Sequence, residues 1–189
     1  MRLRTEAKKR IGMMIKAEKR AVKFALWSVA ALAAVRFITG IRQMLQSREK
    51  DVDLLARTIW GEDNVGGYDG MLAVANVVRN RVRAGGWWGA TYSDVILKPY
   101  QFSIWNAKTV ERYENNPMFA AALDRIENVT TATPFFALAQ QIAAAVYDGK
   151  IGDNTGGATH YKLPTAAADW AEGLTPVAHI GSHDFYITS

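Results

Sequence analysis

The sequence predicts a mainly helical α+β domain with a small C-terminal β-sheet, preceded by a long basic and hydrophobic helix. Helix-spaced apolar residues dominate between Asp51 and Asp148, whereas short β-rich segments bounded by Gly and Pro occupy 158–187. Charge divides the chain too. Residues 1–50 hold 13 Lys/Arg against 3 Asp/Glu, and residues 51–189 hold 10 against 15. We therefore predict two parts, 1–50 and 51–189, with different partners.

The basic part predicts one long helix, because no proline and only Gly12 disturb it before Gly40. Its cations precede an uncharged apolar run, Phe24–Val35, as in a signal peptide or signal anchor. That run has 12 residues, fewer than the about 20 that span a bilayer. We expect this helix to bind a membrane or, as the alternative, a virion or envelope protein. The acidic remainder argues against a nucleic-acid reader, although basic helices can bind phosphates nonspecifically.

Four helices are expected after residue 50, and their order follows from spacing and breakers. The residues DVDLLARTIWGE predict a helix with Glu62 in its last turn, ended by Gly66-Gly67. Residues 100–116 are expected to form an aromatic loop, and 158–162 and 177–187 to supply two or three strands. The other expected helices cover 68–83, 91–97 with a Thr91 or Ser93 cap, and 134–148.

The cysteine and histidine content of the chain limits the kinds of site that it can form. There is no cysteine, so disulfides, thiolate metal sites and a cysteine nucleophile are excluded. His179 and His183 have a zinc-like spacing, but on strands they would be about 13 Å apart. They also lack a third ligand unless His160 joins them. We predict no metal and no cofactor.

Glu62 is the candidate catalytic acid. A carboxylate at a helix C-terminus faces the negative end of the dipole, which raises its pKa. Trp60 and the aromatic loop would raise the pKa further by excluding water. A glutamic acid kept protonated near neutral pH is what a general acid for glycosidic cleavage needs. Without a second signal, the alternative is a solvated last-turn residue.

Five ordered blocks over about residues 51–187 supply that second signal. The residues LLARTIWGE at 54–62 and GYDGMLAVANVVRNRVR at 67–83 resemble the opening of the SleB-type, spore cortex-lytic, cell wall hydrolase family. Asp94–Ser103 resembles the segment of that family that ends in Gln-Phe-Ser. GATHY at 157–161 and Trp170 with HIGSHDFY at 179–186 match its C-terminal blocks. One departure is Asp63-Asn64-Val65-Gly66, where family members often carry a small-basic-Gly-Glu continuation.

The resemblance implies a lysozyme-like domain related to lytic transglycosylases, with Glu62 as the acid and peptidoglycan glycan strands as substrate. A lytic transglycosylase needs one carboxylate, whereas ordinary glycosidases need two about 5 to 9.5 Å apart. Asp63 adjoins Glu62 but is expected to point elsewhere. We expect substrate contacts from Gln101, Phe102, Ser103, Trp105, His160 and Tyr161. The alternative for Phe102 is a place in the core, and the alternative for His160 is a structural role.

Two rival functions stay open at this point. One is an N-acetylmuramoyl-L-alanine amidase, against which the poor metal set counts. The other is a wall-binding or phage structural component that keeps the fold without catalysis. The expected location is the cell envelope, either anchored to the inner membrane or periplasmic, or a phage virion component delivered there. A phage endolysin fits the basic, weakly hydrophobic N-terminus.

Overall fold

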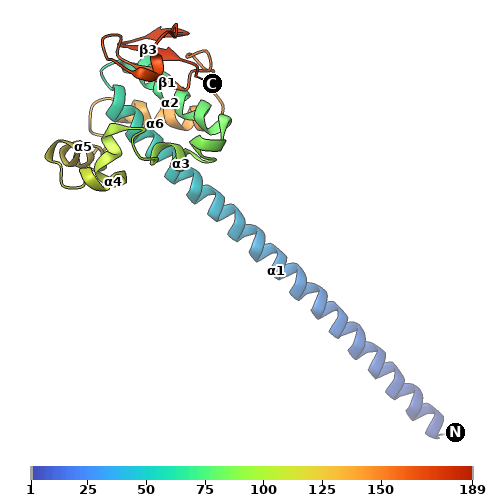
Figure 1. Cartoon of the computed structure of the whole chain (residues 1–189). Coiled ribbons are helices and arrows are strands. Elements are labelled where there is room, and N and C mark those ends of the chain that lie inside the picture. Colours follow the sequence, from blue (N-terminus) through green and yellow to red (C-terminus); the bar gives the residue numbers. More distant parts are fainter. Residues whose placement is uncertain (1, 189) are drawn as a thin grey trace. The chain divides into compact units, whose positions relative to one another are not determined.

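The computed structural model describes the backbone of residues 2–188 and the side chains of residues 6, 10, 12–14, 16, 18–20, 23, 24, 27 and 31–188. Its contacts divide the chain into two compact units, Met1–Arg48 and Glu49–Ser189. Helix α1 runs over Arg2–Asp63 and belongs to both units (Figure 1). The predicted fold class, mainly helical with a small sheet and a long N-terminal helix, is confirmed.

Helix α1 is continuous where the sequence predicted two helices in succession. A single glycine costs a helix only about 1 kcal/mol, so Gly40 does not end it. The Thr39 hydroxyl donates to the Val35 carbonyl at 2.9 Å and stays within the helix. Large apolar side chains in this stretch are exposed, including Phe24 and Trp27. Within the described residues, no helix is both long and apolar enough to cross a membrane. The membrane or protein partner of this helix stays a prediction.

The last turns of α1 enter the core of the second unit. Leu55, Ala56 and Ile59 are fully buried there, as the helical spacing predicted. Helix α2 (Gly67–Ala84) follows after one turn and is buried over almost its whole circumference between residues 70 and 81. It is therefore the central helix of the unit.

Helix α2 lies between the sheet and helix α6 (Figure 1). Ala73 and Val77 pack against Phe185 and Ala158 on the side of the sheet. On another side α2 contacts α6 (Phe136–Tyr147), which the sequence predicted as 134–148. The short helix α3 (Tyr92–Ile96) begins with the predicted Thr91 cap, in which Asp94 completes a capping box.

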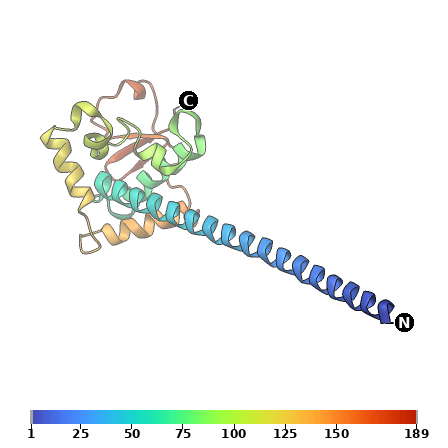
Figure 2. The same cartoon turned by 90° about the horizontal axis from the view of Figure 1, so that it is seen from below.

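The region predicted as a loop over 100–116 is instead built from short helical turns. Burial of Ile104 and Trp105 draws the backbone inward, and the indole N–H of Trp105 donates to Thr58 Oγ1 at 3.0 Å. The turns are η2 (Ser103–Trp105), α4 (Asn106–Thr109) and η3 (Glu111–Tyr113). The sequence also missed α5 (Pro117–Glu127), the yellow helix in Figure 2, which buries only Ile126.

The C-terminal region forms a three-stranded antiparallel sheet, as predicted. Its strands are β1 (His160–Lys162), β2 (Ala178–Ile180) and β3 (His183–Tyr186), in the order β1-β3-β2. Tyr161 pairs with Phe185, and Phe185 also pairs with Ala178. The strand formed last in the chain therefore lies in the middle. A short turn, η4 (Asp169–Ala171), lies between β1 and β2.

Candidate active site

A cavity of about 420 Å³ brings six separate segments of the second unit together around Glu62. It is bounded by the end of α1, the last turn of α2, the segments around residues 87–88 and 100–103, the edge strand β1 and the turn η4. Its walls are polar and aromatic. The lining residues are Glu62, Arg81, Trp87, Trp88, Tyr100, Gln101, Ser103, His160, Tyr161 and Trp170.

Glu62 lies in the last turn of α1, as the sequence predicted. Tyr161 donates a hydrogen bond from its hydroxyl to Oε2 at 2.9 Å. The other oxygen, Oε1, is buried and forms no hydrogen bond of good geometry with the described residues. Because an unsatisfied buried oxygen is costly to ionise, this environment favours the protonated acid.

Burial is the main reason that the pKa of Glu62 is raised above its usual value, and the nearby charge of Asp63 raises it further. The Tyr161 hydrogen bond and the charge of Arg81 oppose the shift, and the backbone of Ile104 opposes it least. Trp60 was expected to exclude water here, but it packs edge-on against Phe136 and donates to the Pro134 carbonyl. Other aromatic side chains line the cavity instead.

Tyr161 is the residue that orients Glu62. The two residues just before its strand, β1, are held to α2 by two side chains. Asn80 donates to the Ala158 carbonyl at 3.0 Å, and Arg81 Nε donates to the Thr159 carbonyl at 2.7 Å. Tyr161 is half-buried, and the burial of its hydroxyl and the neighbouring charge of Glu62 hold the pKa of that hydroxyl well above the usual value. The hydroxyl therefore remains a hydrogen-bond donor throughout the neutral range.

Arg81 places a cation in the wall of the cavity. Its guanidinium lies 4.4 Å from the Trp88 ring centroid and 5.3 Å from that of Phe102. Nη1 is buried and has no hydrogen-bond partner among the described residues. Burial lowers the pKa of Arg81 to about 10, so the group is still charged at neutral pH. The sequence analysis missed this residue, since a basic residue on an apolar helix is commonly a surface residue.

His160 does not contact Glu62. Its Nδ1 lies within 3.1 Å of the Thr159 hydroxyl and 2.9 Å of the Thr188 hydroxyl, and its ring lies against Trp88 and Trp170. Burial and then the charge of Arg81 lower the pKa of His160 to about 4. The imidazole is therefore neutral near pH 7.

Exposed aromatic rings surround the cavity, and the sequence analysis missed most of them. Trp87 and Trp88 follow two glycines and precede Gly89, whose φ of 115° favours glycine. A Cβ at position 89 would also collide with Asp94. Lys98 donates to the Trp87 carbonyl and lies 4.3 Å from its ring. The two consecutive tryptophans in a glycine-rich loop were the sequence feature that could have indicated these cavity-lining rings.

Tyr100 has a left-handed backbone, with φ of 67°, and its ring is exposed. A non-glycine residue in this region stores strain and is often found at a functional site. Here the conformation accompanies a tyrosine that lines the cavity next to Gln101.

The predicted substrate contacts divide into two groups. Gln101, Ser103, His160 and Tyr161 line the cavity with Glu62. Phe102 is 1% exposed and belongs to the core, so it is no direct sugar contact.

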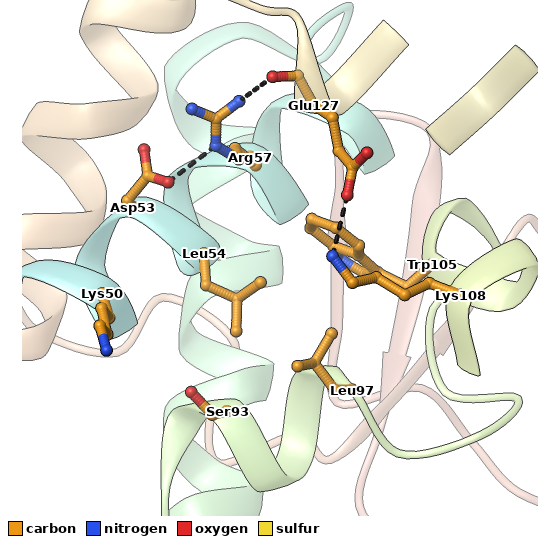
Figure 3. Close-up of a pocket in the computed structure, with 9 residues that line it drawn as sticks. All are labelled: Lys50, Asp53, Leu54, Arg57, Ser93, Leu97, Trp105, Lys108 and Glu127. Carbon is orange, nitrogen blue, oxygen red and sulfur yellow. Dashed lines mark hydrogen bonds and ion pairs between the residues drawn. The ribbon is translucent and has the colours of Figure 1, made fainter. Parts of the chain in front are cut away.

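Trp105 is also buried and lines a different cavity, of about 470 Å³, with Leu97 and Lys108 (Figure 3). Phe102 has an extended backbone just before η2, and its side chain lies in the core, whereas Gln101 and Ser103 on either side of it line the cavity around Glu62.

The histidines of the tail lie on different strands and contact different carboxylates. His179 Nδ1 lies 2.7 Å from Asp184, and His183 Nδ1 lies 3.5 Å from the buried Asp63. Among the described residues, no group of three or more His, Asp or Glu side chains is arranged to hold a metal ion.

Comparison with known proteins identifies the family. The family model described as Cell Wall Hydrolase matches residues 66–186, well over half of the chain. The chain belongs to the cell wall hydrolase family. Its activity is therefore directed at the peptidoglycan of the cell wall, and the SleB-type resemblance predicted from the sequence is confirmed. Glu62 lies just before the matched range.

Two solved structures resemble this cell wall hydrolase. The catalytic domain of the Bacillus cereus SleB protein is 28% identical with a TM-score of 0.53, over 72% of this chain and 89% of that one. The catalytic domain of the germination-specific lytic transglycosylase SleB from Bacillus anthracis is 28% identical with a TM-score of 0.52, over 71% and 92%. No curated protein sequence matches the chain.

Proposed function

We propose that this hydrolase is a lytic transglycosylase that cleaves the bond between N-acetylmuramic acid and N-acetylglucosamine, with Glu62 as its acid and base. The observation that carries the proposal is the composition of the cavity wall: among the described residues, Glu62 is the one carboxylate that lines it. Hydrolysing glycosidases of the usual kind need two carboxylates across the scissile bond. The similarity to a structure named as a lytic transglycosylase supports the same choice.

In the first step, Glu62 transfers its proton to the glycosidic oxygen while the bond from that oxygen to C1 of the muramic residue breaks. The raised pKa of Glu62 keeps the proton available near neutral pH. Once the proton has left, the Tyr161 hydroxyl and the Arg81 charge stabilise the carboxylate. Burial therefore stabilises the protonated form of Glu62, whereas Tyr161 and Arg81 stabilise its carboxylate form.

In the second step, the C6 hydroxyl of the same muramic residue attacks C1, and its proton returns to the Glu62 carboxylate. A 1,6-anhydro ring forms, no water is consumed, and the acid is regenerated. A second carboxylate to activate water is not required, which fits a cavity wall with one carboxylate.

The other lining residues suit a sugar polymer. Trp87, Trp88 and Trp170 offer ring faces and edges on which the apolar faces of pyranose rings can pack. Gln101 and Ser103 supply amide and hydroxyl groups for the sugar hydroxyls and acetamido groups.

The test is mass spectrometry of purified peptidoglycan treated with the whole chain, wild type beside Glu62→Gln. We expect anhydromuramic ends from the wild type and a loss of about 10²- to 10⁴-fold in the variant, since Gln cannot donate the proton. Products that contain only reducing muramic ends would identify a hydrolysing muramidase. Free stem peptides would identify an amidase, and binding without products a non-catalytic protein.

A further inference from the structure

Asp63 is a buried carboxylate next to the catalytic acid, and the proposed reaction does not use it. Its side chain is 4% exposed and does not line the cavity. Oδ1 accepts a hydrogen bond from the backbone N–H of Gly66 at 3.0 Å. Oδ2 is buried, has no hydrogen-bond partner among the described residues and lies 3.5 Å from His183 Nδ1.

Three glycines from three segments surround this carboxylate. A Cβ atom at Gly66 or at Gly70 would collide with it, and a Cβ at Gly181 would lie 3.7 Å from Oδ2. The Asp63 carboxylate therefore occupies the space between the end of α1, the start of α2 and the turn between β2 and β3. A larger side chain at 63 has no room there.

The contacts of Asp63 return to Glu62 through two aromatic side chains. The His183 ring lies edge-on to Tyr161, with the centroids 5.2 Å apart. Tyr161 in turn donates to Glu62. Asp63, His183, Tyr161 and Glu62 thus form a closed set of contacts from α1 through β3 and β1 and back to α1.

We propose that Asp63 is a positioning residue, which together with His183 fixes the end of α1 against β1 and β3 so that Glu62 remains in contact with Tyr161. The inference rests on the proposed function of Glu62. The titratable groups around Asp63 are Glu62 on its own helix, Tyr161 on β1 and His183 on β3. Its charge also raises the pKa of Glu62, because two adjacent negative charges repel.

The principal test is Asp63→Asn in the whole chain, assayed on soluble glycan strands as a function of pH. Asn retains an oxygen for the Gly66 N–H and removes the charge. Because the charge favours the protonated Glu62, its loss moves the alkaline limb of the kcat profile to lower pH. At pH 7 we expect kcat to fall about threefold to tenfold with KM unchanged, and to recover as the pH is lowered.

The matched control is Asp124→Asn, which makes the same chemical change at an exposed carboxylate of α5 that lines neither cavity. Its profile should coincide with that of the wild type. An Asp63→Asn profile that also coincides with the wild type would overturn the proposal. So would a loss of equal size at every pH together with a lowered Tm, since that is the result of a merely structural role.

His183→Phe keeps the proposal testable if Asp63→Asn does not fold. Phe preserves the ring against Tyr161 and removes the nitrogen that faces Asp63. We expect kcat to fall several-fold with KM unchanged, and a wild-type kcat would count against the proposal. The Glu62→Gln variant distinguishes a failure of the proposed function from a failure of the positioning role. If Glu62→Gln stays active, the proposed function fails. If Glu62→Gln is inactive but Asp63→Asn behaves as wild type, the positioning role alone fails.

Discussion

Two cavities of similar size in the second unit differ in how their charged groups are satisfied. In the cavity of Figure 3, Arg57 pairs with Asp53 at 2.8 Å and Lys108 with Glu127 at 2.9 Å. Arg57 also donates to two backbone carbonyls at the end of α5. Two ion pairs thus neutralise four of the five charged side chains that line this cavity, and Lys50 is the fifth.

In the cavity around Glu62, the charged groups are buried and incompletely paired. Glu62 Oε1 and Arg81 Nη1 have no hydrogen-bond partner among the described residues. Leaving such groups unsatisfied costs about 1 to 3 kcal/mol each, so they persist only where another requirement outweighs stability. The two cavities therefore differ in the pairing of their charged groups rather than in volume, which supports the choice of the cavity around Glu62 as the candidate active site.

The largest effect expected from this comparison, after Glu62→Gln, is that of Tyr161→Phe. The variant removes the hydrogen bond that stabilises the Glu62 carboxylate after proton transfer, so kcat should fall about tenfold to a hundredfold. That hydrogen bond lowers the pKa of Glu62, so its loss raises the pKa and moves the alkaline limb of the kcat profile to higher pH. A pH–rate profile measures both effects, and an unmoved limb would contradict the assignment.

A smaller effect is expected from Trp170→Ala at the aromatic edge of the same cavity. Trp170 packs on His160 and Tyr186 but makes no contact with Glu62 in the structure. The loss of a stacked ring costs about 1 to 2 kcal/mol of binding, so KM should rise about fivefold to thirtyfold while kcat changes little. A fall in kcat at unchanged KM would place Trp170 in the chemical step instead.

The smallest effect is expected from Lys108→Ala in the cavity of Figure 3. Its ion pair with Glu127 is about half exposed, and such pairs contribute roughly 0 to 1 kcal/mol. We expect unchanged kcat and KM and a Tm lowered by no more than a few degrees. A large loss of activity would show that the two cavities are less different than their charges indicate.

Local patterns predicted much of this molecule from its sequence. The helical spacing of Leu55 and Ile59 placed Glu62 in the last turn of α1, and the glycines and prolines marked the strands of the tail. The turns over 103–113 were missed because burial of Trp105, a tertiary contact with Thr58, decides their conformation. Phe102 and Trp105 were placed among the substrate contacts for the same reason.

The sequence analysis predicted the direction of the pKa shift of Glu62 but not its main cause. The raised pKa of Glu62 was attributed first to the helix dipole, whereas burial is the larger effect. The part played by Tyr161 depends on a contact across 99 residues of sequence, between α1 and β1, and no local pattern reports such a contact. Arg81 was missed because its burial depends on the same sheet.

The strand order of the sheet has a consequence for the timing of activity during synthesis. Strand β1, which carries Tyr161, has β3 as its one neighbour in this sheet, and β3 is synthesised after both β1 and β2. A nascent chain that has passed Trp170 but lacks residues 183–186 has every other wall of the cavity and no partner for β1. Such a chain has Glu62 without a fixed Tyr161. Glu62 and Tyr161 can therefore take up their fixed geometry only after translation has passed β3.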